Sequence, residues 1–293
     1  MRPLWLCLLL LFALPACQSD SDVTRGEDGT LRLGREEARA MTERAVRLGD
    51  RTLVLDSETG SLSVVGTDAE EVRLRIERIA RGATLGSAQS RLERLTIDEA
   101  GDDEIYQYVF RCNGVEGARI DVVAEVPRGA RLNVALERGT IRLSDAAGDV
   151  AVLNELGSVE ATGLGGREVS VQTELGDIEA AFAALPAEAD VQIETGNGSV
   201  TLTLPGGASA EVSAQTQTGT IAVEGLAFTD RALNAAGNRF RGRLGRGEAE
   251  VAVETEVGSI SLNEGAAPRS DGPESDTTVV PPGAPVAPSP PVE

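Results

Sequence analysis

The sequence predicts an all-β fold: a parallel β-solenoid with rungs of roughly 20 residues and an irregular N-terminal part. Three observations lead there: a repeated apolar pattern, a glycine at one fixed place in each copy, and an aromatic content of only 3%. Each copy reads apolar-x-apolar-x-polar-x-x-Gly-x-apolar-x-apolar, the polar residue being mostly Ser, Thr or Asn. The glycines of the seven copies are Gly60, Gly139, Gly157, Gly176, Gly198, Gly219 and Gly258.

The repeat predicts two short strands that meet at a corner. Apolar residues alternate with period two on each side of the glycine, and their parity switches across it, so both strands can point their apolar sides inward. Glycine permits the tight corner that a Cβ would oppose. A unit this short cannot bury its own apolar face, so the copies must stack. Stacking predicts a polar ladder at the corner, made of Asn154, Thr173, Thr195, Thr216 and Thr255.

The spacing of the glycines indicates one period along the whole repeat region. Four successive gaps are 18 to 22 residues long, and the gaps of 39 and 79 residues are near two and four periods. Two segments, 65–128 and 225–247, break the pattern, and for the first we expect larger, less regular rungs or a sandwich-like entry. We expect strands at 72–76, 105–110 and 120–126, a helix at 87–95 and a turn at Gly101-Asp102.

The two ends of the chain carry a different signal. Residues 1–16 have a short positive start and an apolar run of signal-peptide length, too short to span a bilayer. They end at Cys17 in Leu-Pro-Ala-Cys, a lipobox-like motif that predicts acylation of Cys17. An ordinary secretory signal is the alternative. We expect a lipidated tether at 17–50 with a short helix at 35–48, a solenoid domain at 51–264 and a disordered Pro-rich tail at 265–293.

Charge and composition exclude several functions. The net charge is −20, and the chain has no His, so the commonest general base and metal ligand is absent. An acidic balance argues against a nucleic-acid partner. We predict no catalytic residue, cofactor site or metal site. Of three cysteines, Cys112 is expected to be a buried apolar residue, because no His can activate it.

Two sets of acidic residues leave alternatives open. Carboxylates two positions before the glycines could form a ladder that binds calcium or a cationic partner, or a solvated turn whose charges splay outward. We favour the solvated turn. The cluster Asp102 to Glu104 is expected at a hairpin tip, and Tyr106, Tyr108 and Phe110 in the core. The acids before the glycines are Glu58, Glu137, Glu155, Glu174 and Glu256.

The segments 122–143 and 240–262 resemble the centre and the end of a large family of bacterial putative-adhesin domains. The first reads VVAEVPRGARLNVALERGTIRL and the second FRGRLGRGEAEVAVETEVGSISL. The resemblance covers about residues 51–264. It implies a β-helical fold in an exported, often envelope-attached protein, and it implies no catalytic residues.

Together these observations favour a lipid-anchored, non-catalytic binding or adhesion module whose ligand is an unknown protein or glycan. Its anchor on Cys17 makes the membrane a partner, and Gln18 after the cysteine favours the outer membrane. Whether it faces the surface or the periplasm stays open. One alternative is a periplasmic structural or signalling accessory that works through a protein partner. A polysaccharide-active β-helix enzyme is the less favoured alternative.

Overall fold

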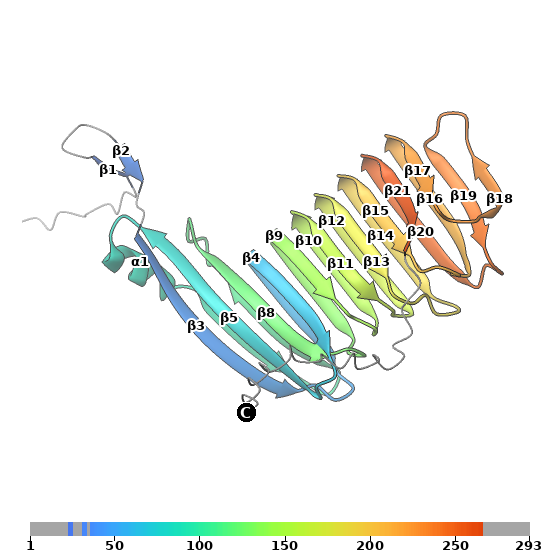
Figure 1. Cartoon of the computed structure of the whole chain (residues 1–293). Coiled ribbons are helices and arrows are strands. Elements are labelled where there is room, and N and C mark those ends of the chain that lie inside the picture. The colour runs from blue at the N-terminus through green and yellow to red at the C-terminus, as the bar shows by residue number, and fades with distance from the viewer. Residues whose placement is uncertain (1–22, 26–30, 34–35, 266–293) are drawn as a thin grey trace, which may run out of the picture.

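Residues 36–265 form one long stack of strands, and β1 (Val23–Arg25) and β2 (Leu31–Leu33) form a separate two-stranded antiparallel sheet. The structure, a computed structural model, describes residues 23–25, 31–33 and 36–265. The predicted signal peptide, Cys17 and the tail from residue 266 onward lie outside this part. Figure 1 shows the strands side by side along one axis, with β3 (Glu36–Arg47) near one end. The hairpin of β18 (Thr229–Leu233) and β19 (Arg239–Leu244) lies at the opposite end.

Each predicted repeat forms one rung, with one strand before its glycine and one after it. In the first two copies a single long strand bends through the corner: β4 (Thr52–Thr67) and β9 (Leu132–Ser144). The other copies form strand pairs: β10 (Val150–Leu156) with β11 (Val159–Leu164), β12 (Glu168–Leu175) with β13 (Ile178–Phe182), β14 (Asp190–Asn197) with β15 (Val200–Leu204), β16 (Ala210–Thr218) with β17 (Ile221–Glu224), and β20 (Ala249–Val257) with β21 (Ile260–Glu264).

The strands before the corners form a first sheet, and those after the corners form a second. In the first sheet the parallel order is β4, β9, β10, β12, β14, β20, β16. In the second it is β4, β9, β11, β13, β15, β21, β17. The repeats pair in register, so the predicted parallel β-solenoid is confirmed.

Two repeats do not stack in sequence order, and here the prediction of one continuous period is wrong. The last repeat, β20–β21, lies between β14–β15 and β16–β17. The reason is the hairpin β18–β19, which extends the first sheet antiparallel beyond β16. The last repeat therefore pairs with the other edge of β16, between β16 and β14. The gap of 39 residues holds this hairpin instead of a missing rung.

The segment 65–128 builds the other end of the stack. β7 (Ile105–Arg111) and β8 (Arg119–Pro127) pair parallel with β4, one in each sheet, and make one further rung. β5 (Glu71–Gly82) pairs antiparallel with β8, and β6 (Thr96–Gly101) with β7. Helix α1 (Leu85–Leu92) begins at a capping box of Thr84 and Ser87. The expected strands, helix and turn in this segment are confirmed.

The helix expected at 35–48 is wrong. Residues 36–47 form β3, which pairs antiparallel with β5 over all twelve residues. Ala, Glu and Arg favour a helix, but an isolated helix of this length is marginal in water. Pairing with β5 satisfies the backbone of β3 along one side and covers the edge of the second sheet, which outweighs the local preference.

The core is a column of aliphatic layers between the two sheets. In the third repeat Val150 and Val152 are buried before the glycine, and Val159 and Ala161 after it, so the parity switch is confirmed. The aromatic residues of β7 close the column at one end: Tyr108 and Phe110 are fully buried, with ring centroids 6.3 Å apart. Cys112 is buried beside them, as expected.

Candidate binding surface

The corner glycines form a column that fixes how closely the rungs approach. Gly139 and Gly157 have φ angles of 141° and 138°, which L-residues rarely adopt. A Cβ on Gly157 would lie 1.8 Å from the carbonyl oxygen of Gly139, and a Cβ on Gly139 would lie 1.8 Å from that of Gly60. Every one of the seven glycines would place a Cβ 2.0 Å or less from the backbone of the neighbouring rung. Only glycine therefore fits this column.

The side chains of the predicted polar ladder form hydrogen bonds to this glycine column from the core side. Each of its five side chains is buried and donates to the carbonyl oxygen of the corner glycine in the neighbouring rung. For Thr195 the acceptor is Gly176, at 3.0 Å, and for Thr255 it is Gly198, at 3.0 Å. The ladder bonds to the backbone rather than to itself. It satisfies carbonyls that a buried corner would otherwise leave without a donor.

The carboxylates two positions before the glycines follow the same column on the outside. Glu58 accepts hydrogen bonds from the backbone N–H groups of Cys112 (2.8 Å) and Asn113 (3.0 Å). Burial, and then the charges of Glu58 and Glu155, raise the pKa of Glu137. The row is interrupted at Gly196, which takes the corresponding place in its rung. Among the residues that the structure describes, no cluster of three or more His, Cys, Asp or Glu could hold a metal ion.

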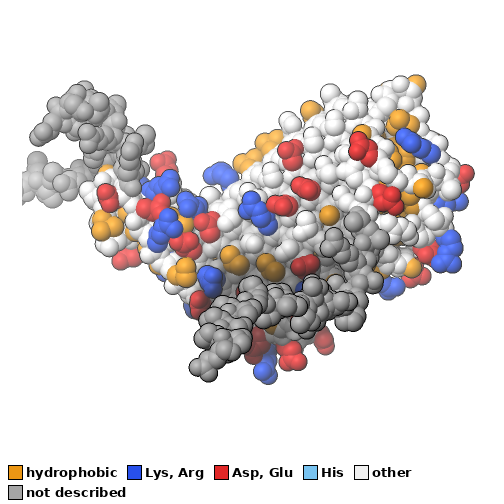
Figure 2. Space-filling view, viewed as in Figure 1, with side chains coloured by type: hydrophobic (Ala, Val, Ile, Leu, Met, Phe, Trp, Pro, Cys, Tyr) orange, Lys and Arg blue, Asp and Glu red, His pale blue; other side chains and the backbone are white. Residues whose placement is uncertain are grey.

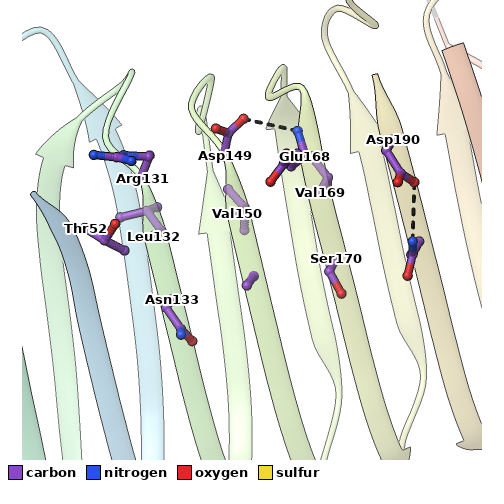
Figure 3. A pocket seen from close by; sticks show the side chains of 12 residues that line it. Thr52, Arg131, Leu132, Asn133, Asp149, Val150, Glu168, Val169, Ser170 and Asp190 are labelled. Carbon is purple, nitrogen blue, oxygen red and sulfur yellow. Dashed lines mark hydrogen bonds between the residues drawn. The ribbon is translucent and has the colours of Figure 1, made fainter. Parts of the chain in front are cut away.

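A groove of 560 Å³ crosses the outer face of the first sheet where its strands begin (Figure 3). The upper edge of the groove is lined by the residues that stand just before the first apolar residue of each rung. In adjacent rungs these are Arg131, Asp149, Glu168 and Asp190. Asp149 accepts from the backbone N–H groups of Arg167 and Glu168, both at 3.1 Å, so its carboxylate is held in place. The next row down consists of Asn133, Ala151, Ser170 and Gln192.

Acidic side chains continue along the first sheet beyond the groove, and Figure 2 shows acidic side chains scattered over the visible face of the stack. Glu168, Asp190, Glu250 and Glu211 lie in register on β12, β14, β20 and β16, and a second row contains Glu194 and Glu254. Neighbouring strands lie about 4.8 Å apart, so these charges repel one another. Within the described chain, only Glu211 of these six forms an ion pair, with Arg243 at 3.0 Å.

The second sheet has a different outer face. The matching rows there consist largely of Ser and Thr, including Ser158, Ser199, Thr201 and Thr203. Of its acids, Glu160 is paired with Arg142 at 3.2 Å on the neighbouring strand, and Glu179, in register with Glu160 on β13, forms no ion pair within the described chain. The outer face of the first sheet therefore carries a continuous row of four acids in register, whereas the acids of the second sheet stand among Ser and Thr.

The strand-start acids were missed by sequence reasoning, although the repeat contained the signal. An acid stands directly before the first apolar residue in five of the seven copies, at Asp149, Glu168, Asp190, Glu211 and Glu250. The acid cluster that the sequence singles out, Asp102 to Glu104, lies at the β6–β7 hairpin tip as expected. Asp102 accepts from the N–H groups of Glu104 (2.8 Å) and Ile105 (2.9 Å), which lower its pKa, the Ile105 bond most.

The fold and its faces define a two-sheet β-solenoid that offers broad polar surfaces and a shallow groove. A family model described as Toastrack DUF4097 matches residues 48–263, and the chain belongs to this family of unknown function. In the part that the structure describes, no helix is long and apolar enough to cross a membrane.

The solved structures to which the chain is similar share little sequence with it. A putative cell adhesion protein from Clostridium sporogenes is 14% identical, with a TM-score of 0.48, and the match covers 78% of this chain and 100% of that one. A putative adhesin from Bacteroides fragilis is 12% identical, with a TM-score of 0.29, over 76% and 97% of the two chains. A putative lipid binding protein from Parabacteroides distasonis is 8% identical, with a TM-score of 0.23, over 77% and 96%. No curated protein matches the chain.

Proposed function

We propose that the protein is a non-catalytic binding or adhesion module of the cell envelope. In this proposal, acyl chains on Cys17 hold it in the outer membrane, and the solenoid presents the outer face of its first sheet to a protein or glycan. The observation that carries the proposal is this face: an extended surface of hydrogen-bonding side chains and unneutralised carboxylates, supported by a rigid stack. Such a surface suits recognition over a broad area.

The chemistry of the surface supports a binding role over an enzymatic one. The chain has no His, and Asp102, in the tightest acidic cluster, already accepts two backbone hydrogen bonds within its own turn. Cys112 is buried, and burial, with the nearby charges of Glu58 and Glu137, raises the pKa of its thiol to about 11. A thiol in that state is a poor nucleophile at neutral pH.

The anchor is tested by a matched pair of cysteine variants in cells. Cys17→Ala removes the proposed acylation site, and Cys112→Ala removes the buried thiol as a control. We expect the first variant to leave the membrane fraction and to lose incorporation of labelled palmitate, while the second keeps both. Membrane attachment of Cys17→Ala equal to that of the natural chain would refute the anchor.

Exposure is tested by adding protease to intact cells and probing the solenoid with an antibody. Digestion on intact cells is the result expected for an adhesin. Protection until lysis would refute adhesion and favour the second candidate, a periplasmic accessory that acts through a protein partner. Lysed cells serve as the control, because the solenoid must be equally accessible there in both cases.

A further inference from the structure

The segment that ends the solenoid beyond β16, residues 225–247, is called the cap here, and its charge is opposite to that of the rest of the molecule. The segment 225–247, which forms the hairpin β18–β19, has five Arg and one acid, Asp230, in a chain of net charge −20. β19 pairs antiparallel with β16, so its outward side chains extend the outer face of the first sheet. Figure 1 shows this hairpin at the end of the stack opposite β3. The acidic face of the first sheet thus ends in a basic strand.

Two of the cap arginines are free of internal partners. Arg239, Arg241 and Arg243 alternate along β19 on one face, about 6.8 Å apart by strand geometry. Arg243 is neutralised by Glu211 at 3.0 Å and Asp230 at 3.5 Å. Arg239 and Arg241 form no ion pair and donate no side-chain hydrogen bond within the described chain. Their guanidinium groups therefore present unused, fork-shaped donors.

These two arginines line a cleft of 430 Å³ with a defined floor and rim. Phe240 is buried beneath it, and Leu233, which is 44% exposed, forms part of the wall. The rim is a rigid turn: Asn234 Oδ1 accepts from the N–H groups of Asn238 (3.0 Å) and Arg239 (3.1 Å). Gln215 adds an amide to the lining.

We infer that this cleft binds an anionic glycan, a sugar chain that carries carboxylate, sulfate or phosphate groups. The paired arginines match the planar, bidentate geometry of such groups. The amide and the small apolar wall suit sugar hydroxyls and ring faces. The inference deepens the binding role proposed above and rests on it. It concerns the purified chain, so its failure is distinguishable from a failure of the localisation experiments.

The test measures binding of the purified mature chain to polygalacturonate, with dextran as the uncharged polymer, by calorimetry at roughly physiological salt. We expect binding to polygalacturonate and none to dextran. The double variant Arg239→Gln/Arg241→Gln is expected to weaken binding roughly tenfold or more, because hydrogen bonds to charged groups are lost. The control Arg73→Gln/Arg75→Gln makes the same change of net charge on β5, at the far end of the stack, and should leave the affinity unchanged.

A third variant makes the opposite prediction. Glu254 lines the same cleft and forms no ion pair within the described chain, so Glu254→Gln should strengthen binding by removing a repulsive charge. Equal weakening by the two arginine pairs, or no binding to polygalacturonate, would overturn the inference. Equal affinity for polyglutamate would assign the cleft to acidic polypeptides and would overturn the glycan assignment. Thermal unfolding of each variant confirms that it is folded.

Discussion

Replacing Gly157 by alanine tests whether the glycine column sets the spacing of the rungs. The added Cβ would lie 1.8 Å from the carbonyl oxygen of Gly139 and 2.8 Å from its carbonyl carbon. Both atoms belong to the backbone, so a change of side-chain conformation cannot relieve the clash. Asn154 donates to the same oxygen at 3.1 Å, and any shift of the rung disturbs that bond as well.

The size of the effect follows from two costs. Holding an L-residue at a φ of 138° costs about 1–3 kcal/mol, and overpacking a buried contact costs about 1–3 kcal/mol. Together they predict a loss of roughly 2–6 kcal/mol in the free energy of unfolding. For a domain of this size that lowers the midpoint of thermal unfolding by about 5–20 °C.

The assay is scanning calorimetry of Gly157→Ala beside Gly129→Ala. At Gly129 a Cβ would meet no heavy atom within 4 Å, and φ is ordinary. Alanine there should leave stability unchanged or raise it by about 0.4–1 kcal/mol, because the unfolded chain loses freedom. Equal midpoints for the two variants would refute the claim that the column limits the approach of the rungs.

Three further predictions concern single side chains. Asn154→Thr should raise the midpoint, because Asn154 Oδ1 is buried without a partner and Thr fills this ladder position in four other rungs; a lower midpoint would contradict it. Glu137 has a raised folded-state pKa, so its contribution favours the fold at low pH and is lost as pH rises through that pKa. Glu137→Gln should therefore stabilise the fold by less than about 1 kcal/mol at neutral pH, and by less still at a pH near the ordinary pKa of a carboxyl group. Equal melting shifts at the two pH values would contradict this. Cys112 should react with a thiol reagent under mildly alkaline conditions only after unfolding, since burial raises its pKa to about 11, and rapid labelling of the folded chain would contradict this.

The sequence predicted the solenoid because its repeat encodes local rules. Period-two alternation, a parity switch and a glycine at the corner each follow from strand and turn geometry, and Thr173 or Thr195 could be placed at the corner from the pattern alone. The order of the rungs could not be predicted in this way. It depends on which side of β16 the chain returns to after the hairpin β18–β19, and nothing local to the last repeat encodes that.

The candidate surfaces were only partly predictable for a related reason. An acid directly before a rung's first apolar residue, such as Glu168, is a repeat position and could have been found. The cap cleft could not, because it joins Gln215 of β16 to Arg239 of β19, and that contact needs the antiparallel pairing of the hairpin. The strand β3 was mistaken for a helix because its partner β5 lies beyond the whole of β4 in the chain.

The insertion of the last repeat between two earlier ones has a consequence for how the chain is completed. A ribosome releases residues 249–264 after every other repeat has been made, yet their place is in the interior of the stack. Until they arrive, β14 has an open edge and β16 lacks its parallel neighbour. The native pairing of β14 and β16 with β20 can therefore form only after the last repeat has been synthesised.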